Sequence, residues 1–422
     1  MIPPPGGISA VRSDAASLQW AAMLSVAEAE QRVAEAVGPL PTEDCALLNA
    51  HGRVLRQPLV ADRDLPPFDR VAMDGYALRH AAWTAGLRRW RVAGLQAAGT
   101  IALAVPADDA CIEVMTGAAL PRGADSVVPY EDAVREESFI TLTPGRKIEA
   151  GQAVHRRGSD RAAGAVIVAP GVRLGGVEIA VAAACGYAHL ALTQQPKIAV
   201  VATGDELVEV GAAVAPHQIR RSNDYALRAM LLAAGHPRVE CYHLRDLRQE
   251  IEHRLWHIVA EYDVVLLAGG VSKGKFDFVP QVLDALGVRK IFQGVAQRPG
   301  KPFWFGLSPR RTPVFALPGN PVSCCVCLHR YVLPALGRMS ALPAAAPQHA
   351  ALAERLVVHP SLTAFVPVKL APHDGLERRA VPVAANTSGD FASLAGTDGF
   401  VELPAGGGEF PAGAAVRFWP WA

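Results

Sequence analysis

Four glycine- and proline-rich loops beside short apolar strands decide the fold of this chain. They read KIAVVATGDEL (197–207), DVVLLAGGVSKGKFDF (263–278), RPGKPFWFG (298–306) and PVFALPGNPVS (313–323). Ligands of open α/β sheets bind at loops that follow the carboxyl ends of strands, and glycine lets such backbone approach a ligand closely. The charged residues of these loops are Asp205, Glu206, Lys273, Lys275, Asp277, Arg298 and Lys301. This mixture suits a phosphorylated or oxyanionic ligand held together with a divalent metal ion.

Strands and helices alternate around these loops, from residue 196 to 340. Such alternation predicts a mostly parallel sheet covered on both faces, in a three-layer α/β domain. The predicted strands are 197–202, 238–243 and 263–268, with others around 289, 303 and 314. The predicted helices are 223–235, 247–261, 278–286 and one that starts at Pro321.

The remaining sequence predicts three further domains. Residues 61–148 hold short apolar runs separated by Gly, Pro and Asp, which is typical of a compact β-rich module. An amphipathic helix, with a capping box of Ser25 and Glu28, starts before it. A strand, a Pro-Gly turn and a helical run follow it at 163–187 and are expected to pack with the early helix. This interpretation makes 61–148 an insertion in a discontinuous domain.

The domain boundaries that we predict cover nearly the whole chain. Residues 1–16 are expected to be a disordered tail. An alanine- and proline-rich linker is expected at 341–350, before a small all-β domain. The predicted domains are 17–60 with 149–195, 61–148 inserted between them, 196–340, and 341–422.

Composition excludes several classes of protein. Lys and Arg number 41 against 40 Asp and Glu, so there is no basic excess for bulk nucleic-acid or membrane-surface binding. The spacing of Cys324, Cys325 and Cys327 does not fit paired zinc ligands, so we interpret all seven cysteines as reduced. We find neither a signal peptide nor an apolar run of about 18 residues, and we expect a cytoplasmic protein.

Each loop also has a simpler interpretation. Gly269 to Lys275 has phosphate-loop spacing, but Phe276 stands where Ser or Thr would hold magnesium. A glycine turn that presents backbone amides to another phosphate fits better. Asp277 alone could stabilise a helix start. RPGKP is an anion clamp or a solvated basic turn; LPGNP sets backbone and Asn320 at a helix start.

Taken together, the motifs resemble one family. Their order is PPFD..AMDGYA, MTGA.LP.GAD.VV..ED, RR.G.D, ATGDEL, I..SN, GGVS.G..D, PGKP and LPGNPVS, followed by SLAGTDGFVELP at 393–404. This order resembles the molybdopterin molybdenumtransferase family, which includes MoeA and the gephyrin E domain. The resemblance runs from about residue 18 to the carboxyl terminus.

The resemblance implies a fold, a reaction and partners. It implies an elongated homodimer of four-domain subunits: a molybdopterin-binding-like α/β domain, a β-rich inserted domain, a mixed linker domain and a small C-terminal β-barrel. The implied reaction joins molybdate to adenylylated molybdopterin, depends on Mg²⁺ and releases AMP. The implied active site lies in the cleft between subunits. Molybdopterin adenylyltransferase and recipient molybdoenzymes are the expected partners, with no nucleic acid or membrane.

The resemblance also assigns residues. Catalytic roles fall on Asp74, Thr116, Glu206, Asp246 and Asp277, and Asp160 matches a further functional acid. Cofactor-binding positions are Gly269, Gly270, Ser272, Lys273, Lys275, Arg298, Gly300, Lys301, Pro318, Asn320 and Pro321. Magnesium or the phosphates are expected at Glu206, Asp246 and Asp277, while Asp74 and Thr116 are expected to reach across the dimer.

Three positions depart from the family pattern. Many members have an acid at Lys275, an acid at Arg221 and a serine at Val71. Lys275 and Arg221 are expected to make the pocket more basic, which would tune anion affinity, favour tungstate or mark a divergent paralogue. A molybdopterin adenylyltransferase is a second hypothesis, but this chain has GGVS rather than a Gly-Gly-Thr-Gly loop, in only one such domain. A non-enzymatic molybdopterin-binding scaffold is the third.

Overall fold

The structure is a computed structural model that describes residues 23–270, 278–371, 378–383 and 387–421. The chain divides into two compact units. The larger comprises Met1–Asp44, Gly52–Arg56 and Ala191–Ala422, and the smaller comprises Cys45–His51 and Gln57–Leu190. Among the described helices, none is long and apolar enough to cross a membrane.

A six-stranded sheet in the order β16-β13-β17-β21-β20-β18 is the base of the larger unit. β16, β13, β17 and β21 run parallel, whereas β20 is antiparallel to both of its neighbours. Every residue of β13, β17 and β21 is buried, as expected for strands covered on both faces. The strands are β13 (Ile198–Thr203), β16 (Val239–Leu244), β17 (Val264–Ala268), β18 (Arg289–Gln293), β20 (Trp304–Leu307) and β21 (Pro313–Leu317). The predicted, mostly parallel sheet is confirmed.

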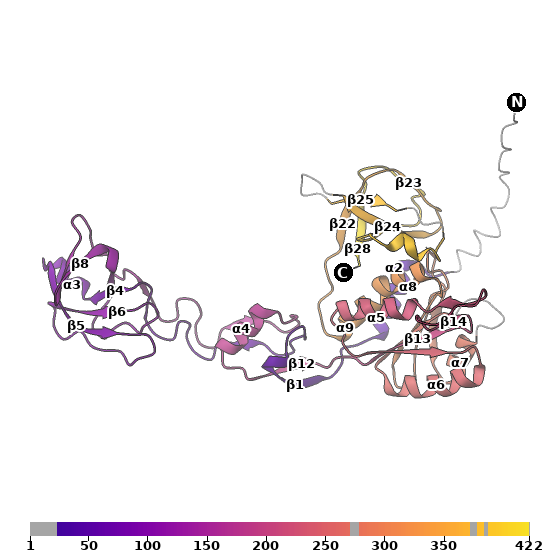
Figure 1. Cartoon of the computed structure of the whole chain (residues 1–422), viewed down its shortest axis with the longest axis horizontal. Coiled ribbons are helices and arrows are strands. Elements are labelled where there is room, and N and C mark those ends of the chain that lie inside the picture. The colour runs from indigo at the N-terminus through magenta and orange to yellow at the C-terminus, as the bar shows by residue number, and fades with distance from the viewer. Residues whose placement is uncertain (1–22, 271–277, 372–377, 384–386, 422) are drawn as a thin grey trace, which may run out of the picture. The chain divides into compact units, whose positions relative to one another are not determined.

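Helices cover the two faces of this sheet (Figure 1). Val200 and Leu266 face one core with α5 and α8, and their neighbours Val201 and Leu267 face the other core with α6 and α7. Alternate residues therefore serve opposite faces, and the three-layer prediction is confirmed. The helices are α5 (Asn223–Ala233), α6 (Arg248–Glu261), α7 (Val279–Ala285), α8 (Pro321–Cys327), the π-helical η3 (Leu328–Val332) and α9 (Leu333–Met339).

The early helix α2 (Val26–Ala36) begins with the predicted capping box. The Ser25 amide donates to Glu28 at 2.7 Å, and the Glu28 amide donates to Ser25 Oγ at 3.2 Å. The expected packing of this helix against 163–187 is wrong. Its apolar side chains Val26 and Val33 join the α/β core instead, because that core offers the apolar residues of α9 and β18.

The C-terminal domain is a small closed barrel. Strands β24, β25, β22, β28 and β26 pair in turn, and β24 pairs with β26 to close the ring. They are β22 (Gln348–Leu352), β24 (Thr363–Ala371), β25 (Arg379–Pro382), β26 (Gly399–Leu403) and β28 (Ala415–Pro420). Short elements beside them are β19 (Gln297–Arg298), β23 (Leu356–Val357), β27 (Glu409–Phe410) and η4 (Phe391–Leu394). The predicted linker 341–350 is too long, because β22 already pairs with β28 from Gln348.

The smaller unit contains the predicted β-rich module. Its six-stranded sheet has the order β7-β4-β6-β5-β9-β8, and all its pairings except β5 with β6 are antiparallel. The strands are β4 (Gly75–Leu78), β5 (Arg89–Gln96), β6 (Ala110–Val114), β7 (Ser126–Pro129), β8 (Ala133–Glu136) and β9 (Phe139–Leu142). Smaller elements are η1 (Leu47–Asn49), β2 (Leu59–Val60), β3 (Arg70–Val71), α3 (His80–Thr84), η2 (Tyr130–Asp132), β10 (Val154–His155), β11 (Val166–Val168) and α4 (Gly176–Ala184).

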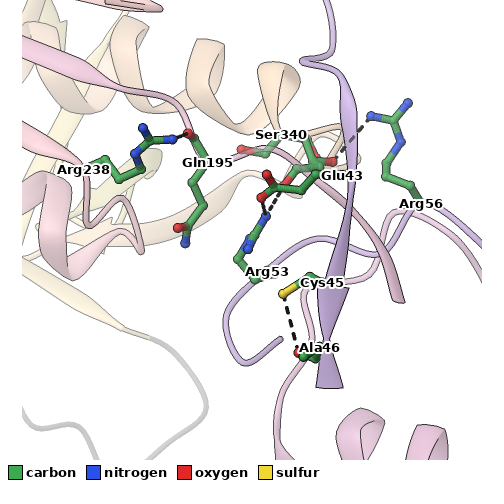
Figure 2. Close-up of polar contacts among 9 residues, drawn as sticks. Glu43, Cys45, Ala46, Arg53, Arg56, Gln195, Arg238 and Ser340 are labelled. Carbon is green, nitrogen blue, oxygen red and sulfur yellow. Dashed lines mark hydrogen bonds and ion pairs between the residues drawn. The ribbon is translucent and has the colours of Figure 1, made fainter. Parts of the chain in front are cut away.

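Two arginines tie together the segments by which the chain leaves and rejoins the larger unit (Figure 2). Arg53 is buried, pairs with Glu43 and donates to the Thr193 carbonyl at 2.9 Å. Arg56 donates its backbone amide to the Ala191 carbonyl at 2.9 Å. Thr193 Oγ1 in turn donates to the carbonyl of Ser340 at 2.8 Å. Glu43 lies in β1 (Thr42–Ala46), and Ala191 and Thr193 lie in β12 (His189–Thr193); these two strands pair with each other.

Candidate active site

The carboxyl ends of β13, β17 and β21 lie on one edge of the central sheet. Val201 pairs with Leu267, Leu267 with Ala316, and Ala316 with Trp304, which fixes this edge residue by residue. The helix after β13 covers one face and the helix after β17 covers the other. Neighbouring parallel strands whose helices leave on opposite faces form the switch point at which α/β proteins bind ligands.

Two glycines follow β17 at this switch point. Gly269 and Gly270 have φ angles of +109° and +68°. A Cβ at Gly270 would lie 2.6 Å from the Val279 side chain and 2.9 Å from the Thr203 hydroxyl. Only glycine satisfies both the dihedral angles and the space, so the turn presents bare backbone. Ser272, Lys273, Lys275 and Asp277, predicted to continue this loop, lie outside the described residues.

The Thr203 hydroxyl, at the end of β13, faces the glycine turn. Thr203 is 5% exposed, and its Oγ1 has no hydrogen-bond partner among the residues that the structure describes. Buried hydroxyls without a partner are uncommon in proteins, and each asks for an explanation such as a missing ligand or water. Sequence reasoning did not select Thr203, although it directly precedes the Gly204-Asp205-Glu206 turn.

The predicted acids Glu206 and Asp246 follow the neighbouring strands β13 and β16. Asp205 Oδ1 accepts a hydrogen bond from the Asp246 amide at 3.2 Å, so the two loops touch. The Glu206 carboxylate folds back over Gly204, where an added Cβ would lie 2.5 Å from Glu206 Oε2. Within the described ranges no group of three or more His, Cys, Asp or Glu residues is arranged to hold a metal ion. Since Asp277 is not described, the three-acid metal set stays a prediction.

The LPGNP loop after β21 is held by three hydrogen bonds to two other segments of the chain. Asn223 Nδ2, at the start of α5, donates to the Gly319 carbonyl at 2.7 Å. Asn320 Nδ2 donates to Ser388 Oγ at 2.5 Å, and the Ser388 carbonyl accepts the Val322 amide at 3.2 Å. Ser388 belongs to the C-terminal domain and was missed by sequence reasoning, since a lone serine in a polar turn carries no signal of such a distant contact.

The RPGKP loop lies at the same edge, because Gln293 at the end of β18 pairs with Trp304 at the start of β20. Arg298 is exposed, and Lys301 is partly exposed. Beneath them the fully buried Gln297 donates Nε2 to the Pro299 carbonyl at 3.1 Å. The backbone of the loop that carries these two cations is therefore fixed by a buried amide.

Arg221 does not add positive charge to the site as expected. It forms ion pairs with Glu209 and with Asp224, a residue that is 0% exposed. Burial lowers the pKa of Arg221, but these carboxylates outweigh that effect and raise it. Two carboxylates therefore balance the charge of Arg221. It anchors the ribbon of β14 (Leu207–Val208) and β15 (Ile219–Arg220) to α5.

In the smaller unit the predicted residues Asp74 and Thr116 are in direct contact. Asp74 Oδ1 accepts hydrogen bonds from Thr116 Oγ1 at 2.7 Å and from the Thr116 amide at 2.6 Å. These two bonds lower the pKa of the exposed Asp74 carboxyl. Asp160 accepts from His155 Nε2 at 2.8 Å. Val71, where the family pattern has serine, is fully buried in the apolar core of the module.

Comparisons with known proteins agree with this architecture. The model described as "MoeA N-terminal region (domain I and II)" matches residues 24–186. The "Probable molybdopterin binding domain" matches 199–338, and the "MoeA C-terminal region (domain IV)" matches 349–421. The second match contains every strand end of the candidate site described above.

Similar proteins extend over nearly the whole chain. A molybdopterin molybdenumtransferase of Synechocystis sp. is 40% identical over 88% of this chain and 93% of its own. One of Staphylococcus aureus is 30% identical over 93% and 94%. A solved molybdopterin biosynthesis MoeA protein from Pyrococcus horikoshii superposes with a TM-score of 0.79 at 28% identity, covering 95% of this chain and 99% of that one. The chain therefore belongs to the molybdopterin molybdenumtransferase (MoeA) family.

Proposed function

We propose that this protein inserts molybdenum into adenylylated molybdopterin and releases AMP in a magnesium-dependent step. The observation that carries the proposal is the convergence of bare glycine backbone, carboxylates and a cationic loop at one switch point of the α/β domain. A pyrophosphate-linked substrate and the molybdate dianion need such a combination of amides, cations and metal-binding oxygens.

We assign the binding of the substrate's phosphates and of molybdate to the loops that carry glycine and basic residues. Backbone of Gly269 and Gly270 can approach phosphate oxygens closely because no side chain intervenes. Arg298 and Lys301 supply positive charge on a loop whose backbone is fixed from below by Gln297. Rigid placement matters because each misplaced contact weakens alignment of the reacting groups.

The metal is assigned to carboxylates at the adjoining strand ends. Glu206 and Asp246 offer oxygen donors, which magnesium prefers, and the contact between their loops supports a shared site. Asp277 completes the set in this proposal. Bound magnesium would polarise the phosphoryl group and offset negative charge as AMP leaves.

The homodimer implied by the family resemblance is part of the proposal. Asp74 and Thr116 are the groups that one subunit would give to the active site of the other. Their mutual hydrogen bonds keep the carboxylate ionised and oriented, which supports a role in binding or proton transfer rather than in folding.

The test is AMP release from adenylylated molybdopterin by the purified protein, with and without molybdate and magnesium. We expect release that depends on both and that reactivates a molybdoenzyme lacking its cofactor. Glu206→Ala should reduce this activity sharply, while its melting temperature and oligomeric state match those of the wild type. Tight cofactor binding without release would reject the insertase and favour a carrier or scaffold. Faster turnover with tungstate would instead identify a tungstate-preferring enzyme.

A further inference from the structure

Three polar side chains on the helix that follows the LPGNP loop have no part in the proposed chemistry. Cys324 lies in α8 with Cys327, and Tyr331 lies in η3 of the same continuous helix. They are 1%, 0% and 2% exposed. Their spacing along the chain is three and then four residues, which places them on one side of a helix. We call these three residues the loop-support face.

Cys324 contacts the LPGNP loop directly. Its thiol donates to the Pro318 carbonyl at 2.8 Å. Burial raises the pKa of this thiol well above its ordinary value, so it stays protonated and able to donate at neutral pH. Asn223 holds the next carbonyl, that of Gly319, at 2.7 Å.

These two bonds fix the direction of the loop's backbone amides. The peptide bonds after Pro318 and Gly319 are trans, so each N–H points away from the carbonyl of the same peptide group. With each carbonyl turned onto a protein donor, the Gly319 amide points away from Cys324 and the Asn320 amide points away from Asn223. Gly319 and Asn320 are themselves exposed.

Tyr331 and Cys327 support the RPGKP loop. The Tyr331 hydroxyl donates to Gln297 Oε1, and Gln297 Nε2 donates onward to the Pro299 carbonyl at 3.1 Å. Cys327 Sγ lies 3.6 Å from the same Gln297 nitrogen. This chain of contacts runs from the helix, through one buried amide, to the turn that carries Arg298.

Gly300 shows how closely this turn rests on its support. Its φ angle is +98°, and an added Cβ would lie 2.4 Å from Gln297 Nε2 and 2.9 Å from Cys327 Sγ. A side chain at this position would push the turn away from the helix. Glycine at position 300 therefore lets the turn lie directly against the polar groups of residues 297 and 327.

We infer that the loop-support face positions the LPGNP and RPGKP loops at once, with Cys324 setting LPGNP and Tyr331, through Gln297, setting RPGKP. These are positioning residues, because none of them is proposed to touch the substrate. The inference rests on the proposed function for its catalytic consequence but not for its structural one. It also gives a role to a cysteine cluster that does not have the spacing of a zinc site.

The chain supplies a matched control for Cys324. Cys325 is the adjacent residue, is equally buried at 1% exposure, and lies on the same helix. Cys324→Ala and Cys325→Ala remove the same atoms from equally buried positions. Only the first removes the donor to Pro318, and Cys324→Ser restores a donor there.

The experiment measures backbone order and catalysis in the full-length protein. In hydrogen-deuterium exchange, peptides spanning 313–323 should exchange faster in Cys324→Ala than in Cys325→Ala, with recovery in Cys324→Ser. Peptides spanning 294–303 should exchange faster in Tyr331→Phe. For molybdate-dependent AMP release, we expect kcat/KM to fall about 10- to 100-fold in Cys324→Ala and Tyr331→Phe. Cys325→Ala should stay within about twofold of the wild type, the scatter of a substitution away from the site.

The outcomes separate the two proposals. Unchanged exchange in both Cys324→Ala and Tyr331→Phe would overturn the positioning inference whatever the activity. If the wild-type protein releases no AMP but the variants Cys324→Ala and Tyr331→Phe still show faster exchange, the proposed function is rejected and the positioning of the loops is kept. Equal kcat/KM for the Cys324→Ala and Cys325→Ala variants of an active enzyme would also overturn the inference.

Discussion

In the α/β domain the loops of the candidate site are held by side chains from distant segments, whereas the Asp74 carboxylate in the smaller unit is held by its contact with Thr116. Gly319 depends on Asn223 and Asn320 on Ser388, from two other parts of the chain. Asp74 is exposed, and both hydrogen bonds to its carboxylate come from Thr116. The position of the α/β loops therefore depends on several parts of the domain, whereas the orientation of the Asp74 carboxylate depends on one residue.

This difference has a consequence for mutation. Changes to Gln297 and Tyr331, which support the RPGKP loop, should alter stability and activity together, because both side chains are buried. Changes at Asp74 and Thr116 should alter activity while stability is nearly constant, since exposed groups contribute little to folding.

The largest effect that would sharpen this contrast is expected for Arg221→Met. It leaves Asp224, which is 0% exposed, without its cation, and breaking a buried ion pair in this way costs about 3–5 kcal/mol. Urea denaturation measures the free energy of unfolding. The double variant Arg221→Met with Asp224→Asn should recover part of the loss, and a single variant as stable as the wild type would contradict buried pairing.

Gly270→Ala comes next. The new Cβ would lie 2.6 Å from Val279 at a φ of +68°, so the turn must shift and AMP release should fall about 100-fold. Gly211→Ala is the control, because nothing lies within 4 Å of its Cβ and no positive φ is required. Similar steady-state rates for the two variants would show that the glycine turn does not set the active geometry.

Thr116→Val tests the locally held carboxylate. Loss of the Thr116 hydroxyl should raise the lowered pKa of Asp74, so the acidic limb of the pH–rate profile should move to higher pH. We expect kcat/KM at neutral pH to fall about tenfold. A depressed carboxyl pKa contributes stability that is present at neutral pH and lost as pH falls through it, so any loss of stability in Thr116→Val is largest near neutrality and vanishes at acidic pH. Because the Asp74 carboxyl is exposed, we expect this difference in melting temperature to be small. A profile that overlays that of the wild type would remove Thr116 from the mechanism, and Thr116→Ser is the conservative control.

The smallest effect is expected for Ser388→Ala. One hydrogen bond from the C-terminal domain to Asn320 is lost, and a change of about threefold in KM is consistent with the modest net energy of such bonds. Ser388→Thr keeps the hydroxyl and should behave as the wild type. A loss of kcat larger than that of Gly270→Ala would reverse the order proposed for these contacts.

Much of the α/β domain could be predicted from sequence, since its strands are continuous apolar runs that end in glycine turns. The bounds of β13, β17 and α6 differ from prediction by one residue at most. Strand β22 was missed because QHAAL has weak strand character, and its pairing with β28 and β25 comes from closure of the barrel. The helix α2 was assigned to the wrong neighbour, since an amphipathic pattern predicts a buried face but not the surface that covers it.

The candidate site could be predicted only in part. The sequence predicted that glycine, acidic and basic residues come together in the loops after the strands, because the carboxyl ends of parallel strands lie on the same edge of the sheet. The buried supports Gln297 and Tyr331 had no such signal, since each acts through a contact between segments far apart in sequence. Asn223 belongs to the I..SN motif, but its contact with Gly319 could not be predicted. The pairing of Arg221 was likewise hidden, because Glu209 and Asp224 look like ordinary surface acids until the ribbon folds. The predicted domain boundaries, metal ligands and dimer contacts stay predictions.

The backbone hydrogen bond between Arg56 and Ala191 joins the two ends of the long segment that lies between them. Residues 57–190 leave and return at two positions joined by a backbone bond of 2.9 Å, beside the Arg53 contacts of Figure 2. A long excursion whose ends already meet adds little strain to the domain that carries it, because loop-closure entropy grows only slowly with length. The larger unit therefore carries this segment on two strands that already pair with each other, and the sheet of the α/β domain does not depend on the path of the chain between residues 57 and 190.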